Sequence, residues 1–270
     1  MNPTLDSNAS VGGLAVSRPD LIPVFDRLGI DYCCHGGESL SQACRRAGVE
    51  ILDIIGAASE PAPDATVNTP SEPDPAAMTM SQLCEHIEAV HHIRAREIFE
   101  SLGPLVDRVV SAHGHSDPRY AELAAVITQL REEMIDHMVR EERVLFPWLR
   151  RLEQAGAIHI GPPWSVRRPI DCMVHDHQSV AEGFARIRAI TRDYTTPAGA
   201  CGSVVALLTI LREFEADTRH HIHKENNILF PAGIRAEAGA SQRHEMGNVL
   251  DPDGTCSQAE GGTCHGVTRP

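Results

Sequence analysis

The sequence predicts an all-α protein, in which a small helical domain precedes an antiparallel four-helix bundle. Aromatic residues make up only 4% of the 270 positions, and the abundance of Ala, Leu, Glu and Arg favours helix over sheet. The pattern HxxxExxxLFP also occurs twice, at His137–Pro147 and His221–Pro231, exactly 84 residues apart in both its His and its Glu. Apolar residues recur at three- and four-residue steps around both copies, so each copy is expected on a helix.

Residues 1–56 are expected to form the small N-terminal domain. It contains the adjacent cysteines Cys33 and Cys34. Two short helices are expected after them, with Ser39 as a candidate N-cap of the first and Gly48 between the two. A domain of this length has a marginal hydrophobic core. We therefore expect it either to dock on another part of the chain or to be mobile.

Residues 57–78 are rich in Pro, Ala, Ser and Thr and are expected to form a semi-rigid or disordered linker. The stretch Thr79–Gln82 has the form of a capping box and should open the first bundle helix. Pro104 should kink or break that helix. The pair Asp117-Pro118 should open the second bundle helix.

A connection containing Gly and Pro, at about 156–163, should lead to the third bundle helix. Pro197 and Gly202 precede the fourth, which should end by Gly239, so that the bundle spans 79–238. Four helices with polar residues facing inward at mid-height are typical of an up-and-down bundle. The remaining residues, 239–270, are expected to be a disordered tail.

The composition excludes several classes of partner. A net charge of −13 argues against nucleic acid or an anionic membrane, since both require a basic surface. The longest apolar run is too short to span a bilayer, and the first fifteen residues lack a signal peptide, so we expect a cytoplasmic protein. In that compartment eight cysteines favour thiol or metal chemistry over disulfides, and fifteen histidines also favour metal. The oligomeric state stays open, with a homodimer as one alternative.

Each bundle helix offers a histidine that could face inward, and two helices add a glutamate one turn further on. An ionised glutamate in a buried stripe costs several kcal/mol or more unless a partner or a metal compensates it. The repeat places such a glutamate twice in the same register. A metal centre explains this repetition, whereas a pair of core His–Glu hydrogen bonds does not. The predicted metal ligands are His86, His137, Glu141, His175, His221 and Glu225.

Two HxxxE helices that face each other would place two carboxylates between two metal ions, with two imidazoles completing each ion. Imidazole and carboxylate without thiolate are typical ligands of non-haem iron or manganese, and zinc is also compatible. We therefore expect two non-haem iron ions with oxo and carboxylate bridges. Periodicity does not decide between His175 and His177 on the third helix. The neighbours that could compete as ligands are His91, His92, His177, His220 and His223.

These motifs resemble a known family. Glu-His86-Ile, Val-His175-Asp and the two repeats look like the hemerythrin-like domain of the Repair of Iron Centres proteins. Asp31-Tyr-Cys33-Cys34 followed by Gly36-Gly37 looks like the small N-terminal domain of the same family. The matches span roughly residues 11 to 238, and the order of the two domains agrees. One departure is His35, which is inserted where the family usually runs Cys-Cys-Gly-Gly.

The resemblance implies a non-haem di-iron centre and supports His175 as the ligand on the third helix. It also implies that the protein restores iron–sulfur clusters damaged by nitric oxide or oxidants, through iron donation, reduction of NO, or both. Damaged iron–sulfur proteins would then be its partners, with NO or O2 as small ligands. Cys33 and Cys34 would take part in redox chemistry or iron transfer.

The alternative is an O2 or NO carrier or sensor without turnover. The N-terminal cysteine pair favours repair, because a simple oxygen carrier has no need of it. Whether the di-iron site acts as an enzyme is a question that the sequence leaves open.

Overall fold

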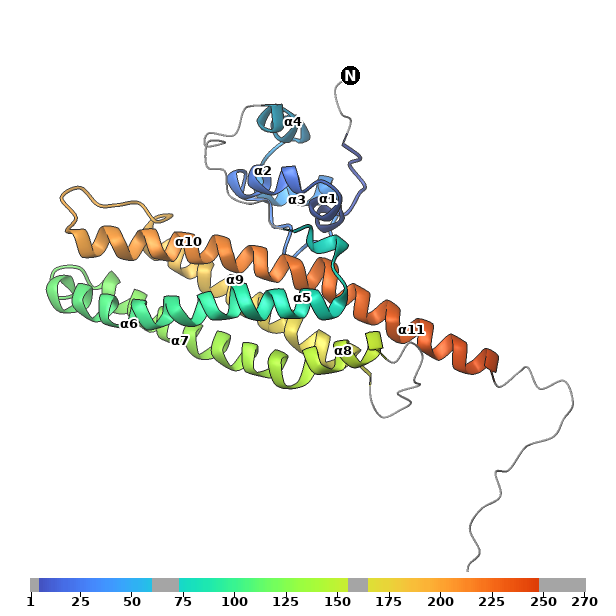
Figure 1. Cartoon of the computed structure of the whole chain (residues 1–270). Helices are drawn as coiled ribbons and strands as arrows, with labels where there is room; N and C mark the ends of the chain where they lie inside the picture. The colour runs from blue at the N-terminus through green and yellow to red at the C-terminus, as the bar shows by residue number, and fades with distance from the viewer. Residues whose placement is uncertain (1–4, 60–72, 155–164, 248–270) are drawn as a thin grey trace, which may run out of the picture.

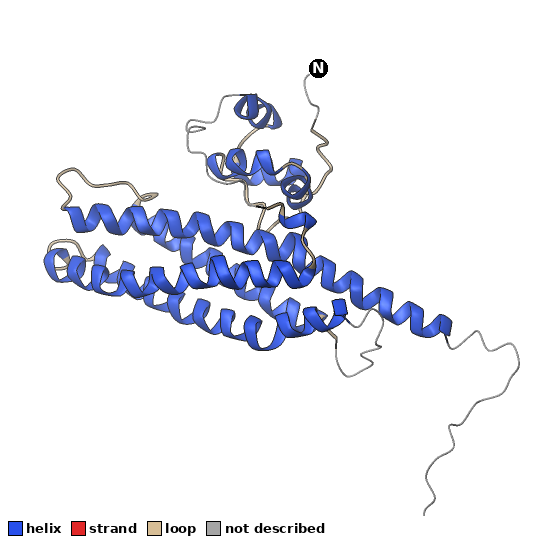
Figure 2. Ribbon diagram, viewed as in Figure 1, coloured by secondary structure: helices blue, strands red, loops and turns tan. Residues whose placement is uncertain are grey.

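The computed structural model describes residues 5–59, 73–154 and 165–247. They form a small N-terminal domain and a bundle of four long helices that run alternately in opposite directions (Figure 1). The regular elements in these ranges are helical (Figure 2). The predicted all-α architecture with a four-helix bundle is therefore confirmed.

Each of the four long helices is built from one or more consecutive elements. The first consists of α5 (Met80–His86), η3 (Ile87–His92) and α6 (Ile93–His113). The second consists of α7 (Arg119–Arg140), η4 (Glu141–Leu145) and α8 (Phe146–Gln154). The third is α9 (Arg167–Thr191). The fourth consists of α10 (Gly202–Lys224), η5 (Glu225–Leu229) and α11 (Phe230–Gly247).

Three of the four long helices contain a π-helical turn, namely η3, η4 and η5. A π-turn accommodates one extra residue and rotates the side chains that follow it, and such turns are frequent at functional sites. The apolar spacing in the sequence predicts regular helices and gives no sign of the π-turns. Two of them begin at the glutamates of the repeated motif.

The helix starts agree with the sequence, whereas one predicted helix end is wrong. Thr79 and Gln82 form the predicted capping box, and so do Ser39 and Gln42 in the N-terminal domain. However, α6 continues through Pro104 without a break. Proline removes one backbone hydrogen bond, but the exposed surface at this position lets water satisfy the freed carbonyl, while Leu102 and Val106 stay packed in the core.

The fourth long helix also extends beyond the predicted end, because α11 reaches Gly247 rather than stopping by Gly239. In the N-terminal domain, α4 (Ile51–Ser59) continues past the predicted boundary at residue 56. Of the predicted linker, 57–78, residues 60–72 lie outside the described residues. So do the whole of the predicted connection at 156–163 and residues 248–270 of the predicted tail.

The remaining elements of the N-terminal domain are α1 (Val11–Ser17), η1 (Pro19–Leu21), α2 (Ile22–Arg27) and α3 (Leu40–Ala47). This domain lies against α10 and η5 (Figure 1). Its fully buried Phe25 and Tyr32 belong to the same hydrophobic cluster as Phe214 of the bundle. Of the two expectations for this domain, docking is the one that the structure shows.

Three side chains of the fourth long helix hold the docked domain through its backbone. Arg219 Nη2 donates to the carbonyl oxygen of Ile30 at 2.8 Å. Asn226 Nδ2 donates to the carbonyl of Cys33 at 3.1 Å, and Asn227 Nδ2 to that of Tyr32 at 2.9 Å. The Cys33-Cys34 segment is consequently fixed over the junction of α10 and η5.

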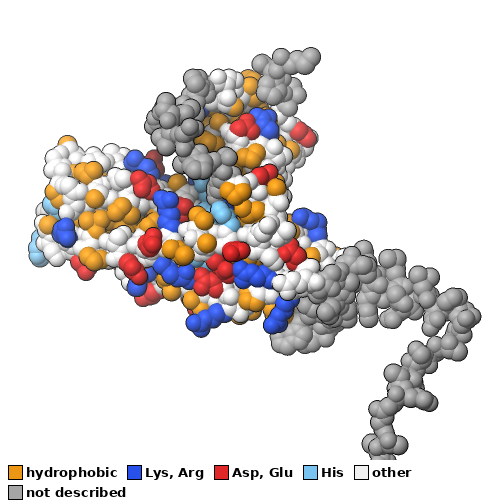
Figure 3. Space-filling model, in the orientation of Figure 1, with side chains coloured by type: hydrophobic (Ala, Val, Ile, Leu, Met, Phe, Trp, Pro, Cys, Tyr) orange, Lys and Arg blue, Asp and Glu red, His pale blue; other side chains and the backbone are white. Residues whose placement is uncertain are grey.

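On the face shown in Figure 3, acidic and basic side chains are interspersed along the bundle. This pattern differs from the continuous basic surface that binds nucleic acid. None of the helices within the described ranges has the length and apolarity needed to cross a membrane.

Candidate metal centre

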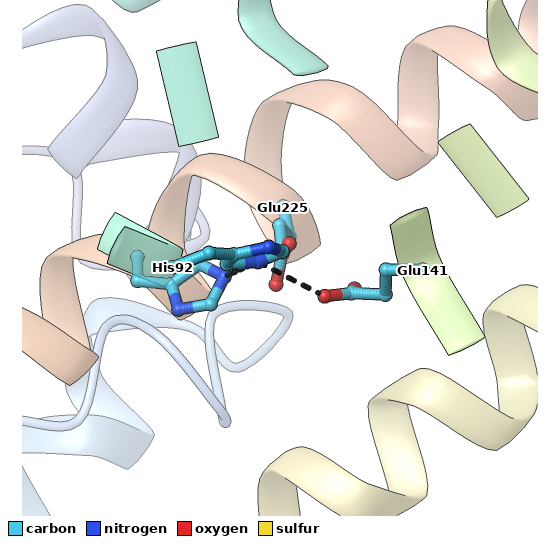
Figure 4. A group of neighbouring side chains, drawn as sticks. His92, Glu141 and Glu225 are labelled. Atoms are coloured by element: carbon cyan, nitrogen blue, oxygen red, sulfur yellow. Dashed lines mark hydrogen bonds and ion pairs between the residues drawn. The ribbon is translucent and has the colours of Figure 1, made fainter. Parts of the chain in front are cut away.

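Six buried side chains converge between the four long helices. They form two groups that share both glutamates, and within each group one ligand atom of every residue lies within 4.8 Å of the others. Figure 4 shows Glu141 and Glu225 pointing towards each other, with His92 beside them. A carboxylate that belongs to both groups can bridge two metal ions. The two groups are His92, Glu141, His221, Glu225 and His137, Glu141, His177, Glu225.

The repeated motif places one histidine and one glutamate on the same face of each of two helices, four residues apart. His137 Nε2 lies 3.2 Å from Glu141 Oε2, and His221 Nε2 lies 3.0 Å from Glu225 Oε1. The third and first long helices then supply one further imidazole to each glutamate. His177 Nε2 lies 3.0 Å from Glu225 Oε2, and His92 Nε2 lies 3.4 Å from Glu141 Oε2.

Polar partners on the far side of three rings fix how these imidazoles are turned. His92 Nδ1 lies 2.8 Å from Glu142 Oε1, and His137 Nδ1 lies 3.3 Å from Asp176 Oδ2. His177 Nδ1 lies 3.0 Å from Asn226 Oδ1. A carboxylate or amide oxygen only accepts hydrogen bonds, so each Nδ1 carries the proton. In the neutral form that binds a metal, each of these rings therefore directs the lone pair of Nε2 into the centre.

With those lone pairs directed inward, the nitrogen and oxygen atoms of the cluster do not satisfy one another's hydrogen-bonding capacity. The Nε2 atoms of His92 and His221 are 3.3 Å apart, and those of His137 and His177 are 3.2 Å apart. Two neutral imidazoles that both present lone pairs at this distance repel each other. Neither carboxylate oxygen of Glu141 accepts a hydrogen bond, although both are buried. A cation between the nitrogen and oxygen atoms removes both conflicts, so these residues fit a metal centre.

The electrostatics of the buried glutamates also favour positive charge at this position. Burial disfavours the charged form of His137, but the neighbouring Glu141 and Asp176 raise its pKa to about 10. Burial likewise opposes ionisation of Glu225, but His221 and His177 hold its pKa well below the ordinary value. In the absence of a metal, the proton on His137 therefore helps to compensate the carboxylates, and a divalent ion can replace it.

The Leu-Phe-Pro end of each repeat closes the centre. Phe146 is fully buried and stacks on His92, with ring centroids 5.8 Å apart. Phe230 stacks on His177 at 6.0 Å with nearly parallel rings. The two phenylalanines exclude water from one side of the centre and limit the movement of the rings.

Four of the six predicted ligands lie in this cluster, whereas His86 and His175 do not. His86 is half-buried, and its Nε2 lies 3.0 Å from Nζ of the buried Lys224. His175 is exposed on the surface of α9. The structure brings His92 and His177 to the positions for which those two were predicted.

Once the folded structure shows which helix faces are buried, helical periodicity accounts for both of the missed residues. On α9, His177 continues the buried stripe of Met173, Val180 and Phe184, whereas His175 is rotated by about 200° from His177 on the helix. On the first long helix, His92 precedes a run of buried residues at steps of three and four. That run is Ala95, Phe99, Leu102, Val106 and Val109.

The predicted cysteine pair lies beside the cluster. The Sγ atoms of Cys33 and Cys34 are 3.8 Å apart, and Cys34 Sγ lies 3.7 Å from the carbonyl oxygen of His177. Together with Asp31 they form a further group of three potential metal ligands. The fold therefore brings the thiols next to one of the helices that build the centre.

Comparisons with known proteins agree with this architecture. Residues 85–233 match the Hemerythrin HHE cation binding domain, and residues 7–58 match a Domain of Unknown function (DUF542). Two similar curated proteins are the iron-sulfur cluster repair proteins YtfE of Yersinia pseudotuberculosis serotype IB (strain PB1/+) and Yersinia pestis (strain Pestoides F). Each is 30% identical to this chain over 232 residues, which cover 85% of this chain and 98% of the relative.

The cluster of histidines and glutamates lies within the range of the cation-binding domain, and the cysteine pair lies within that of the N-terminal domain. The domain order and the nearly complete coverage of the relatives agree with the resemblance stated from the motifs. The chain therefore belongs to the hemerythrin HHE family, in the two-domain form of the Repair of Iron Centres proteins.

Proposed function

We propose that this protein holds two non-haem iron ions in the buried His and Glu cluster and repairs damaged iron–sulfur clusters. The observation that carries the proposal is the pair of buried glutamates shared by two pairs of inward-facing imidazoles. The similar Yersinia proteins are named for iron–sulfur cluster repair, which supports the same activity in this chain.

The ligand atoms favour iron in this arrangement. Nitrogen and oxygen donors without thiolate suit non-haem iron, and two shared carboxylates suit a pair of ions. Two imidazoles and the two shared glutamates would hold each ion. When bound, the two irons would supply redox chemistry and would bind NO or O2.

The protein's own residues orient and protect this centre. Glu142, Asp176 and Asn226 hold three of the rings by Nδ1, so that each Nε2 points inward. Phe146 and Phe230 restrict access of water. We assign Cys33 and Cys34 the roles of redox partners or carriers of iron, because they lie against the backbone of a ligand residue.

The metal content tests the centre. Protein purified without oxygen should contain two irons per chain, and after oxidation its Mössbauer and absorption spectra should show an oxo-bridged ferric pair. Full occupancy by zinc, or a single iron per chain in such preparations, would contradict the di-iron proposal.

The cysteine pair separates repair from the alternative of an O2 or NO carrier or sensor. Replacing Cys33 and Cys34 by serine should leave the di-iron spectrum intact, because neither thiol belongs to the His and Glu groups. The same change should abolish restoration of an NO-damaged iron–sulfur enzyme in a reconstituted assay. If the double variant restores the enzyme at the unaltered rate, the carrier or sensor becomes the better assignment. The cytoplasmic location and the homodimer stay predictions from the sequence.

A further inference from the structure

We infer that Asp31, Cys33 and Cys34 form a separate site for one thiophilic divalent metal ion, next to the His and Glu cluster. If the proposed function holds, that ion is ferrous iron, and the site deepens the role assigned there to the cysteine pair. The ligand atoms of these three side chains all lie within 4.8 Å of one another.

The spacing of the two sulfur atoms fits a shared metal ion. Two thiolates bound to a tetrahedral ion at about 2.3 Å lie about 3.8 Å apart. The Sγ atoms of Cys33 and Cys34 are separated by 3.8 Å. A disulfide would require about 2.0 Å instead. The two cysteines are free thiols in hydrogen-bond contact, at a spacing that a shared metal ion would need little movement to occupy.

The carboxylate of Asp31 is fixed beside the sulfurs by the turn that it caps. Its Oδ1 accepts hydrogen bonds from the backbone N–H groups of Cys33 and Cys34, at 3.2 and 2.9 Å. The same oxygen lies 3.3 Å from Cys33 Sγ. Two thiolates and one carboxylate carry three negative charges, which suits a divalent cation, and thiolate selects zinc or iron over calcium or magnesium.

His35, the residue inserted in this chain between the cysteines and the glycines, orients the carboxylate. Its Nδ1 lies 2.6 Å from Asp31 Oδ2, the oxygen that does not face the thiols. A histidine that holds the far oxygen of a ligating carboxylate typically contributes tenfold or more to metal affinity. The unusual Cys-Cys-His-Gly-Gly order therefore has a physical role at this site.

The side-chain carboxamide of Asn226 connects the site to the His and Glu cluster. Asn226 Nδ2 donates to the carbonyl of Cys33, and Asn226 Oδ1 accepts from Nδ1 of His177. Three protein ligands leave one tetrahedral position open, and open sites exchange their ligands more readily than closed ones. Cys34 and Asp31 are only half-buried, so that position can be reached from solvent. The arrangement suits an ion in transit rather than a structural metal.

Cobalt(II) tests the site, because thiolate ligands give it a charge-transfer band in the near ultraviolet that imidazole and carboxylate ligands do not. Full-length protein with reduced thiols and an iron-loaded cluster is titrated with Co²⁺ under nitrogen. We expect one equivalent of cobalt per chain to produce the band. Cys33→Ser/Cys34→Ser should lose it, and His35→Ala should weaken cobalt binding by about tenfold. Asp31→Asn should weaken binding more than His35→Ala.

Two control variants should keep the full band. Cys172→Ser removes an exposed cysteine of α9, and Cys256→Ser/Cys264→Ser removes two cysteines near the end of the chain. Unchanged di-iron absorption and circular dichroism show that each variant is folded. No band in the unaltered protein, a band that survives in the Cys33 and Cys34 double variant, or unchanged affinity in Asp31→Asn would each overturn the inference.

The outcome is independent of the repair assay. Cobalt binding at the thiols without repair of a damaged enzyme would leave this site standing and remove the proposed function. Repair without a thiolate–cobalt band would leave the proposed function standing and remove this site.

Discussion

His175 and His177 are only two residues apart on α9, yet the helix sends their side chains to opposite sides. Each residue of an α-helix is rotated by about 100° from the one before, so this pair is separated by about 200°. His177 is buried in the cluster, while His175 is exposed. Whether a histidine on this helix can be a ligand is therefore decided by the side of the helix on which it lies, not by its chemical identity alone.

The first prediction compares these two histidines with a shared glutamate. Glu225→Ala should lose or loosen both irons, because its carboxylate belongs to both groups. His177→Ala should lower affinity mainly at one iron, since an imidazole serves one ion. His175→Ala should keep two irons per chain. Iron counted after incubation with a chelator measures all three. Equal losses in His175→Ala and His177→Ala would contradict the ligand assignment.

The second prediction concerns the close approach of Gly36 to the bundle. A Cβ atom at this position would lie 2.3 Å from Asn227 Oδ1 and 2.7 Å from the backbone oxygen of Tyr32. The backbone atom cannot move away cheaply, so Gly36→Ala should destabilise the folded protein by about 1–3 kcal/mol. Gly37→Ala is the matched control, since a Cβ there meets no atom within 4 Å. Urea unfolding of both variants gives the comparison, and similar stabilities would disprove the steric argument.

At the scale of elements, the π-turns η4 and η5 lie where the bundle must turn large charged side chains into its core. Both begin at the glutamates of the centre and end before a buried phenylalanine. The extra residue in each turn changes the rotation between the glutamate and the Leu-Phe-Pro sequence. This allows the carboxylate and the phenyl ring to face the same centre from successive turns.

The third prediction concerns the start of α5, where a side chain of another helix acts as a cap. Glu153 of α8 accepts hydrogen bonds from the backbone N–H groups of Met80 at 2.7 Å and Ser81 at 3.0 Å. Burial raises the pKa of Glu153, but the hydrogen bonds from Ser81 and Met80 lower it below its ordinary value overall. Because the pKa of Glu153 is lower in the folded state, its charged form adds to the stability at pH values above the unfolded-state pKa. This contribution is lost as the pH falls through the folded-state pKa.

Glu153→Gln should therefore reduce the free energy of unfolding by about 1 kcal/mol at pH 7, which is the usual effect of losing a cap. The difference from the unaltered protein should shrink as the pH falls below 4, where the glutamate becomes neutral. Denaturant unfolding at both pH values measures this change. A difference that is constant with pH would show that the charge of Glu153 does not contribute.

At the scale of the whole molecule, the N-terminal domain and the bundle share one hydrophobic cluster and a set of polar contacts along α10. Arg219 makes three of these contacts with a single side chain. It donates to the carbonyl of Ile30, lies 3.1 Å from Asp26 Oδ1, and is centred 5.3 Å from the ring of Tyr32. This arginine therefore helps to keep the cysteine pair over the His and Glu cluster.

The fourth prediction follows from this position. Arg219→Ala should loosen the N-terminal domain and speed amide hydrogen exchange in α1 and α2, while the di-iron spectrum stays the same. Arg212→Ala is a matched control. Arg212 is also on α10 and also lies over a tyrosine ring, but that ring belongs to Tyr194 of the bundle rather than to the N-terminal domain. This variant should leave exchange in the N-terminal domain unaltered. Equal exchange in both variants would mean that Arg219 does not hold the domain.

Sequence patterns were sufficient for the bundle, its helix starts and four of the six residues in the cluster. Two residues at i and i+4 share a helix face whatever the rest of the fold does, so the repeated HxxxE motif predicted His137, Glu141, His221 and Glu225 directly. The caps at Thr79 and Ser39 are equally local, because each needs only the residue three positions further along the chain.

Only the tertiary structure decided which histidines of the first and third long helices join the cluster, and where the thiols lie. The position of His92 depends on a π-turn within its helix, and that of His177 on the face of α9 that packs against α7. The cysteine pair reaches the cluster through contacts with residues almost two hundred positions away, at Asn226 and Asn227. Short-range patterns predict what neighbouring residues do together, but the packing of distant helices is determined by the whole core, which no local spacing encodes.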